Sequence, residues 1–201
     1  MHPNAKFDWK DRSEMLALIQ EVSFCTVFVA TAAGNFAIHV PVLVGGETFL
    51  RFHVAKANRA ASALAEARAL LSCVGPNAYI SPDWYGTPDQ VPTWNYLAVE
   101  AEGRLRTMDL PELVQHLDAL SALQEARLAP KKHWTRAKMR PGLFERMTAG
   151  ILGFEMKIEA LRGTRKLAQH KTAAEVDGAV RGLAASGGAE MAKLMRLEAP
   201  L

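Results

Sequence analysis

Residues 24–54 read FCTVFVATAAGNFAIHVPVLVGGETFLRFHV, and this stretch decides the fold. β-Branched and aromatic residues dominate 24–31, 36–44 and 47–54, while short turn sequences occupy 33–35 and 45–46. Runs of this composition are typical of strands, and turns this short join antiparallel neighbours. The stretch therefore predicts an antiparallel meander of three strands.

The rest of the chain adds further strands and several helices. Strands are expected over 70–74, which Gly75 and Pro76 should end, over 94–106, and over 151–161, which Gly163 should end. Helices are expected over 11–22, 56–69, 109–127 and 172–185, with a short helix after Gly187 and Gly188. Asp109 as N-cap with Glu112 three residues later predicts a capping box, and apolar and polar residues alternate along the 94–106 strand. Six or more strands joined mostly by tight turns predict a mainly β chain with flanking helices, folded as a small antiparallel barrel.

Length and composition fit one sizeable domain of ordinary globular type. The chain has 201 residues, of which 49% are hydrophobic and 22% are charged. No apolar run reaches the ~18 residues that span a bilayer, and the N-terminal residues lack a signal-peptide pattern. We therefore expect a cytoplasmic protein without membrane attachment. Cys25 and Cys73 lie in apolar runs, which predicts two buried thiols and no metal site.

Charge is distributed unevenly along the chain. Residues 127–171 contain twelve basic and three acidic side chains, a net charge of +9, although the whole chain carries only +3. The densest part, residues 127–140, holds six basic residues and no acidic one, together with His133 and Trp134. Such a segment attracts phosphate groups of a cofactor or a nucleic acid, and it is equally typical of a solvated basic loop.

Two dense aromatic and polar runs follow the 70–74 strand. They read GPNAYISPDWY over residues 75–85 and VPTWNY over residues 91–96. Trp and Tyr offer flat apolar surfaces, and Asn, Ser and Thr offer short donors and acceptors, which together suit a planar ligand such as a flavin or a nucleobase. A β-hairpin corner with inward-packed aromatic residues explains the runs equally well.

A phosphate-binding turn is expected where the 47–54 strand meets the predicted 56–69 helix. Lys56, Asn58 and either His53 or Arg59 would surround the backbone N–H groups of the helix start, which attract anions. In the alternative interpretation, Asn58 caps the helix and Lys56 is merely exposed. The sequence contains no Gly-rich dinucleotide motif, no P-loop, and no nucleophile elbow around Ser81, so no catalytic residue is assigned.

These segments together resemble a known family. HVPVL at 39–43, HVAKAN at 53–58, the two aromatic runs, and KLAQ at 166–169 follow the order seen in PaiB-type FMN-binding negative transcriptional regulators. The resemblance extends from about residue 7 to about residue 184. It implies an FMN-binding split β-barrel of Greek-key type, the fold shared with pyridoxamine phosphate oxidases, in a homodimer that builds its flavin sites at the subunit interface.

The resemblance also implies a set of FMN-binding residues. Lys56, Asn58 and the neighbouring His53 would hold the phosphate, and Lys166 and Gln169 would reach the ligand from the same or the partner subunit. The residues expected near the ribityl chain or the ring are Tyr79, Ser81, Trp84, Thr93, Trp94 and Asn95. The chain departs from the family pattern at four positions, Arg59, Glu100, Ala168 and His170.

Two functional classes follow from this interpretation. The first is an FMN-binding regulator that represses transcription, senses flavin or redox state, and contacts DNA. The second is an FMN-dependent oxidoreductase or flavin carrier, for which the absence of an acid–base pair is no obstacle because the flavin supplies the chemistry. In both classes residues 1–201 form one split-barrel domain, with a helical extension over about 172–201.

Overall fold

The computed structural model describes residues 2–31 and 34–198. The chain divides into two compact units, of which the first contains residues 1–15, 74–99 and 162–201 and the second contains residues 16–73 and 100–161. Three long strands contribute to both units, because the chain passes between the units at residues 73, 99 and 161. The two units are described separately below.

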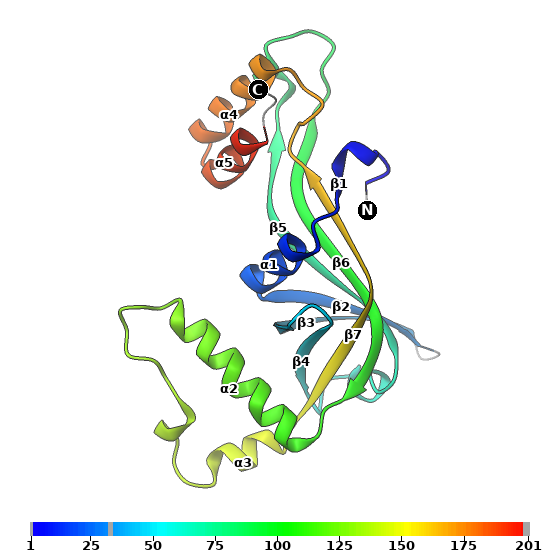
Figure 1. Ribbon diagram of the computed structural model, residues 1–201, viewed down its shortest axis with the longest axis vertical. Coiled ribbons are helices and arrows are strands. Elements are labelled where there is room, and N and C mark those ends of the chain that lie inside the picture. The colour runs from blue at the N-terminus through cyan, green and yellow to red at the C-terminus, as the bar shows by residue number, and fades with distance from the viewer. Residues whose placement is uncertain (1, 32–33, 199–201) are drawn as a thin grey trace. The chain divides into compact units, whose positions relative to one another are not determined.

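The described residues form seven strands and five α-helices (Figure 1), together with short 3₁₀ helices. The strands are β1 (Asp8–Trp9), β2 (Phe24–Thr31), β3 (Gly34–Gly45), β4 (Phe49–Ala55), β5 (Arg68–Ile80), β6 (Thr93–Thr107) and β7 (Ile151–Lys166). The helices are α1 (Arg12–Val22), α2 (Leu110–Ala126), α3 (Leu143–Thr148), α4 (Ala173–Ala185) and α5 (Ala189–Leu197). No helix within residues 2–31 and 34–198 is long and apolar enough to cross a membrane.

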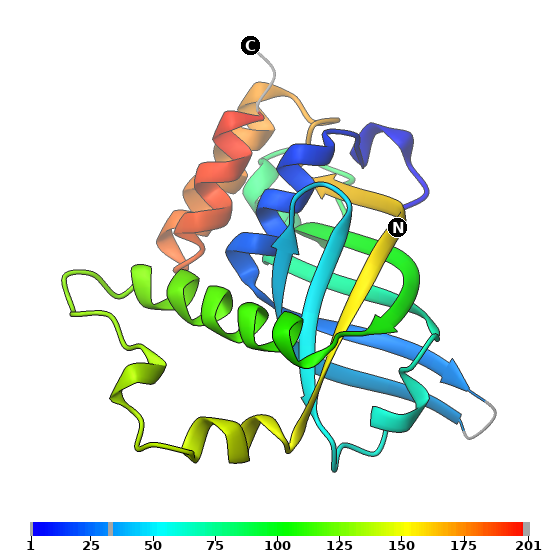
Figure 2. The same cartoon turned by 60° about the horizontal axis from the view of Figure 1, so that its bottom comes forward.

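The second unit contains the predicted meander. Phe24 on β2 lies opposite Pro41 on β3, and Val42 on β3 lies opposite Phe52 on β4, so both pairings are antiparallel as expected. The meander prediction is confirmed, except that Ala33 of the predicted turn lies outside the described residues. Figure 2 shows the three strands side by side, with α2 lying across β3 and β4.

Further pairings join the meander into a closed sheet. β5 pairs with β2, β7 pairs with β4, and the strand order is β1-β7-β4-β3-β2-β5-β6 with an additional pairing between β7 and β6. This last pairing requires a very close approach at Gly103, where a Cβ atom would lie 1.8 Å from the backbone oxygen of Lys157. Glycine therefore allows β6 to reach β7, and the expected antiparallel barrel is formed.

The interior of the second unit follows the predicted alternation. Along β6, Ala101, Gly103 and Leu105 are buried, whereas Arg104 and Arg106 between and beyond them are exposed. Phe52 and Phe154, from β4 and β7, stack at 5.7 Å in the core. Burial of these side chains drives formation of this core, because each buried aromatic or aliphatic side chain contributes about 1.5–3 kcal/mol.

The helix predicted over residues 56–69 is wrong. The segment forms turns and one short 3₁₀ helix, η2 (Ala61–Ala63). Asn58 caps its own turn by accepting a hydrogen bond from the Ala60 N–H, and the Ala67 carbonyl accepts one from the Leu105 N–H of β6. These contacts hold the segment in a path that a regular helix does not follow, so tertiary structure overrides the helix propensity of alanine.

Two predicted strand ends are also wrong. β5 continues through Gly75 and Pro76 to Ile80. Its pairing with β2 ends at Ser72, so a proline beyond that point removes no hydrogen bond of that ladder. Gly163 does not turn the chain but lies within β7, opposite Trp9 of β1. A Cβ atom there would approach Met15 Sδ to 2.7 Å, so this glycine serves close packing.

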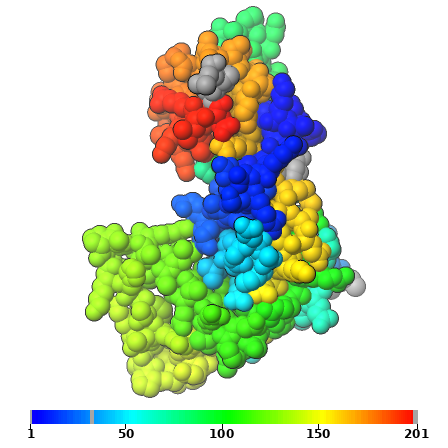
Figure 3. Space-filling model, viewed as in Figure 1, coloured from blue at the N-terminus to red at the C-terminus, as the bar shows by residue number. Residues whose placement is uncertain are grey.

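In the first unit, helices cover the ends of the long strands. α4 begins with a capping box in which the Thr172 side chain and the Glu175 side chain each bond to the backbone of the other residue. α4 and α5 lie side by side (Figures 1 and 3), and Met191 and Met195 of α5 are buried. The helices predicted over 172–185 and after Gly188 are confirmed.

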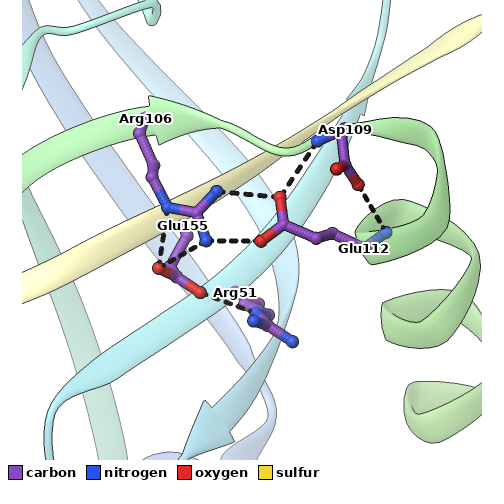
Figure 4. A network of polar contacts seen from close by, with 5 residues as sticks. All are labelled: Arg51, Arg106, Asp109, Glu112 and Glu155. Carbon is purple, nitrogen blue, oxygen red and sulfur yellow. Dashed lines mark hydrogen bonds and ion pairs between the residues drawn. The ribbon is translucent and has the colours of Figure 1, made fainter.

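A network of ion pairs fastens α2 to the strands of the second unit (Figure 4). Glu155 on β7 contacts both Arg51 on β4 and Arg106 on β6, at 2.8 Å in each case. Arg106 also donates two hydrogen bonds to Glu112, which accepts a third from the Asp109 N–H in the predicted capping box of α2. The bidentate geometry makes this network more stabilising than isolated surface pairs.

The close approach of β6 to β7 makes Gly103 intolerant of any side chain. We expect Gly103→Ala to lower the free energy of unfolding by about 1–3 kcal/mol, because the added methyl group overlaps the Lys157 carbonyl. Arg104→Ala, at the exposed neighbouring position, is the control and should change the free energy of unfolding by less than about 0.5 kcal/mol. Urea denaturation measures both, and equal effects would contradict this interpretation of the closure.

The ion-pair network also predicts an acid dependence. Hydrogen bonds from Arg106 lower the pKa of Glu112 from its ordinary 4.5 to about 2, so the stabilisation is complete above pH 4.5 and is lost as the pH falls towards 2. Glu112→Gln should cost about 1 kcal/mol at pH 7, and the difference from the unmodified protein should narrow below pH 4.5. A difference that stays constant from pH 7 to pH 3 in denaturation experiments would exclude this charge effect.

Candidate functional site

The predicted phosphate-binding residues lie in the second unit, after β4. Lys56 is exposed, and its backbone N–H donates to the Gly150 carbonyl at 2.9 Å. Asn58 is half-buried, and its side-chain oxygen is occupied by the Ala60 N–H. Because the expected helix is absent, no helix N-terminus contributes N–H groups here. A phosphate at this turn would rely on the Lys56 ammonium group and the free amide nitrogen of Asn58.

His53 forms a hydrogen bond that the sequence did not suggest. Its Nδ1 atom lies 3.1 Å from Nε2 of His116, a fully buried residue of α2. Burial lowers the pKa of His53, and burial together with the neighbouring His53 and Arg51 lowers the pKa of His116 to about 4. Both imidazoles are therefore neutral at physiological pH. His116 lies in α2, on the helix face that carries buried leucines. A polar residue on that apolar face is the only sequence signal that could have identified it.

In the first unit, Tyr79 and Trp94 form an exposed aromatic pair. Their ring centroids are 6.1 Å apart at an interplanar angle of 63°, and the two residues are 46% and 52% exposed. The Trp94 indole nitrogen donates to the Asn77 side-chain oxygen at 3.1 Å, which fixes the ring. A pair of large aromatic side chains left this accessible and held in place suits stacking against a planar ligand.

Thr93 and Lys166 meet on the opposite side of β6. The Lys166 Nζ donates to the Thr93 hydroxyl at 2.5 Å and lies 5.9 Å from the centroid of the Phe7 ring. Burial lowers the pKa of Lys166. No carboxylate among the residues that the structure describes forms an ion pair with this ammonium group, so a partly desolvated cation lacks a counter-ion.

Asn95 shares that side of the strand but is 1% exposed. Its amide nitrogen contacts Met195 Sδ of α5 at 3.3 Å, and its side-chain oxygen has no hydrogen-bond partner among the described residues. A buried unpaired oxygen of this kind costs about 1–3 kcal/mol. The position of Asn95 beneath α5 separates it from the exposed aromatic pair.

Trp84 and Ser81 lie at η3 (Pro82–Tyr85), the 3₁₀ turn after β5. Trp84 packs against α4, where a Cβ atom at Gly178 would lie 2.1 Å from the Trp84 carbonyl oxygen and one at Gly182 would lie 2.3 Å from the Trp84 ring. Ser81 precedes η3 without a side-chain capping bond. Tyr85 is buried, so the two aromatic runs combine both expected roles, with Trp84 and Tyr85 packed inward and Tyr79 and Trp94 exposed.

Gln169 stabilises the turn in which it lies. Its side-chain oxygen accepts from the Leu167 N–H at 2.9 Å, and its amide nitrogen donates to the Arg165 carbonyl at 2.5 Å. Ala168 adopts a left-handed conformation with φ of 67° in the same turn. His170 packs edge-on against Phe7 at 5.5 Å. The turn thus sets the direction in which the chain leaves Lys166.

The first-unit candidates therefore fall into two sets on opposite sides of the strands. Consecutive residues of a strand point to opposite faces, so Trp94 projects away from Thr93 and Asn95. One set consists of Tyr79 and Trp94, and the other contains Thr93 and Lys166. The first set offers flat apolar surface and the second offers a positive charge.

Comparison with known proteins identifies the family. The family model described as "Putative FMN-binding domain" matches residues 1–160. The chain belongs to this FMN-binding family. It is also 30% identical over 171 residues to "Protease synthase and sporulation protein PAI 2" of Bacillus subtilis, a match that covers 82% of this chain and 80% of that protein. The resemblance to PaiB-type proteins is confirmed.

Solved structures share the fold. The FAD and heme binding protein of Mycobacterium smegmatis superposes with a TM-score of 0.60 at 16% identity, covering 79% of this chain and 73% of that chain. The flavocytochrome Anf3 of Azotobacter vinelandii gives 0.59 at 14% identity, covering 83% and 72%. The predicted split β-barrel of the FMN-binding family is confirmed. The family model ends at residue 160, before Lys166 and Gln169.

The lack of a counter-ion predicts that Lys166 adds little to folding. We expect Lys166→Met to leave the free energy of unfolding unchanged or to raise it by up to about 1 kcal/mol, because the methionine removes a desolvated charge. Lys171→Met is the matched control and should be destabilising, since Lys171 bonds to Gln90 and lies 4.6 Å from the Tyr85 ring centroid. A larger loss for Lys166→Met than for Lys171→Met in thermal unfolding would refute this assignment.

Proposed function

We propose that this protein binds FMN and acts as a regulator of the PaiB type. Membership of the FMN-binding family supports flavin binding, and the partly buried Lys166 without a carboxylate partner is the structural observation that carries it. Natural proteins rarely keep a desolvated cation unpaired unless a ligand supplies the negative charge. Flavin mononucleotide carries an anionic phosphate and a polar ring system, and either could interact with the Lys166 ammonium group.

The residues present fit such a ligand. Tyr79 and Trp94 supply exposed aromatic faces, and Lys166 with Thr93 supplies a cation and a hydroxyl group for an anionic part. Lys56 and the amide nitrogen of Asn58 remain the proposed phosphate contacts in the second unit, with His53 beside them. The remaining proposed contacts are Ser81, Trp84, Asn95 and Gln169, of which Trp84 and Gln169 chiefly position their neighbours.

We further propose that two copies of the chain share each flavin site. Trp94 and Lys166 belong to sets that face opposite sides of the same strands. A flavin stacked on Trp94 of one subunit therefore reaches a Lys166 side chain most directly when that lysine belongs to the other subunit. In a two-fold dimer this arrangement generates two identical sites. Phe24 and Phe28 on β2, 62% and 43% exposed, offer apolar surface for subunit contact.

The regulatory role would use the basic segment of the second unit. Three of its six cations already have carboxylate partners: Arg127 contacts Glu21, Lys131 contacts Glu125, and Arg136 contacts Asp118. The other three, Lys132, Lys138 and Arg140, form no ion pair with a carboxylate among residues 2–31 and 34–198. We propose that these three side chains contact DNA phosphates. Phosphate contacts give affinity that does not depend on the base sequence, so another element would have to recognise a specific sequence.

Flavin binding is tested by titrating the purified protein with FMN and with FAD while recording visible absorption and flavin fluorescence. We expect saturable binding that favours FMN, at least tenfold weaker in Trp94→Leu and in Lys166→Met. Trp134→Leu, which alters another exposed tryptophan in the second unit, is the control and should bind FMN normally. Absence of flavin bands and of any saturation would end the proposal.

DNA binding is tested with random duplex DNA over a salt series. Affinity should fall steeply with rising salt, and alanine at Lys132, Lys138 and Arg140 together should reduce the slope of log K against log[salt] by about three. Alanine at Lys10, Lys157 and Lys193, three exposed lysines outside the segment, is the control. No binding at low salt, together with rapid flavin reduction by NADH or NADPH, would favour the oxidoreductase instead.

A further inference from the structure

The second unit contains a cavity that is lined by second-unit residues alone. It has a volume of about 350 Å³ and is formed by α2, the basic segment, α3, the start of β7 and His53 at β4. Its walls are largely apolar, with the side chains of Leu117, Trp134, Met139, Phe144, Met147 and Ile151. After α2 the chain makes a wide excursion and returns through α3 to β7 (Figure 2), and residues of both helices line the cavity.

The polar groups of the cavity are few and converge. Arg136 pairs with Asp118 at 3.2 Å and lies 4.9 Å from the centroid of the Phe144 ring, so its guanidinium group borders the aromatic wall. Ser121 adds a hydroxyl group, and Thr148 bonds to the Phe144 carbonyl at 2.7 Å. A mostly apolar cavity with a small number of polar groups is the usual form of a small-molecule site.

The buried histidine pair determines which proton His53 can offer. His116 is 0% exposed, and its Nδ1 has no hydrogen-bond partner among the described residues. If His53 donated to His116, Nδ1 of the neutral His116 would hold a buried N–H without an acceptor, which native proteins almost never tolerate. His116 therefore donates from Nε2 to Nδ1 of His53, and His53 carries its proton on Nε2.

This tautomer gives the cavity a hydrogen-bond donor. The Nε2–H group of His53 has no partner among the residues described, and His53 lines the cavity. Residues 127–146, several of which line the cavity, contain seven basic residues and one acidic residue. The Asp118 carboxylate in the lining is already paired with Arg136, so no unpaired carboxylate among the described lining residues opposes an anionic occupant. An occupant suited to this lining carries an aromatic ring that contacts Trp134 and Phe144, and an anionic acceptor for the His53 donor.

We propose that this cavity binds a small aromatic carboxylate, with its rings between Trp134 and Phe144 and its carboxylate at His53 and Arg136. His116 is a positioning residue that fixes the tautomer of His53. The site uses none of the first-unit residues proposed for flavin binding, and of the second-unit residues it uses only His53, so it does not require flavin binding. Occupation of the cavity would order the basic segment that forms its wall, and would thereby alter the cations proposed to contact DNA.

The test uses 2-naphthoate as the probe, with titration calorimetry and tryptophan fluorescence on the full chain. We expect one saturable site per chain, quenching that is lost in Trp134→Phe, and at least tenfold weaker binding of naphthalene-2-methanol, which lacks the charge. Ser121→Phe should fill the cavity and weaken binding at least tenfold, whereas Ser62→Phe, an exposed site elsewhere in the second unit, should not change it.

One further measurement keeps the proposal testable if Ser121→Phe does not fold. Imidazole ¹⁵N shifts should show His53 protonated at Nε2 in the unmodified protein, and this preference should vanish in His116→Phe. Equal binding of the alcohol, unaltered binding by a folded Ser121→Phe, or a His53 protonated at Nδ1 would each overturn the proposal.

Discussion

The strict alternation of side chains along β6 is the constraint on which most of the structure depends. Odd-numbered positions from Asn95 to Leu105 are all buried, while the even-numbered positions between them are partly or fully exposed. In the second unit this alternation directs Ala101 into the core and allows Gly103 to meet β7. In the first unit the same period separates Trp94 from Thr93, so one strand both closes the barrel and divides the candidate ligand contacts between two faces.

Several polar groups without partners lie in the regions to which we assign function. The network around Glu155 satisfies its charges within the second unit and contributes to stability. By contrast, Lys166 has no counter-ion, and the side-chain oxygen of Asn95 and Nδ1 of His116 have no hydrogen-bond partners among the described residues. Buried groups of this kind cost free energy, and proteins keep them mainly where a ligand or a mechanism requires them.

Local patterns predicted the parts of the fold that local interactions form. The meander, the α2 capping box at Asp109, and the alternation along β6 follow from residue type and spacing, and the structure contains all three. The helix over 56–69 and the turn at Gly163 failed because contacts with distant residues decide them, namely Ala67 with Leu105 and Gly163 with Met15. No short-range pattern contains that information.

The candidate site shows the same division. The aromatic runs indicated Tyr79 and Trp94 because unusual composition is visible in a sequence, whereas the role of Trp84 depends on two glycines of α4 about a hundred residues away in the chain. Sequence order also could not show that Trp94 and Lys166 would belong to opposite sides of the strands. The pairing of His53 with His116 joins β4 to α2, and neither histidine has a neighbour in sequence that predicts the other.

Subunit complementation tests the central claim, a flavin site shared by two copies, most directly. The Trp94→Leu and Lys166→Met variants are unfolded together, refolded together and titrated with FMN. If each site takes Trp94 from one subunit and Lys166 from the other, a mixed dimer regains one intact site, and a statistical mixture should recover about a quarter of the normal FMN capacity. Recovery no greater than in either variant alone would contradict a shared site.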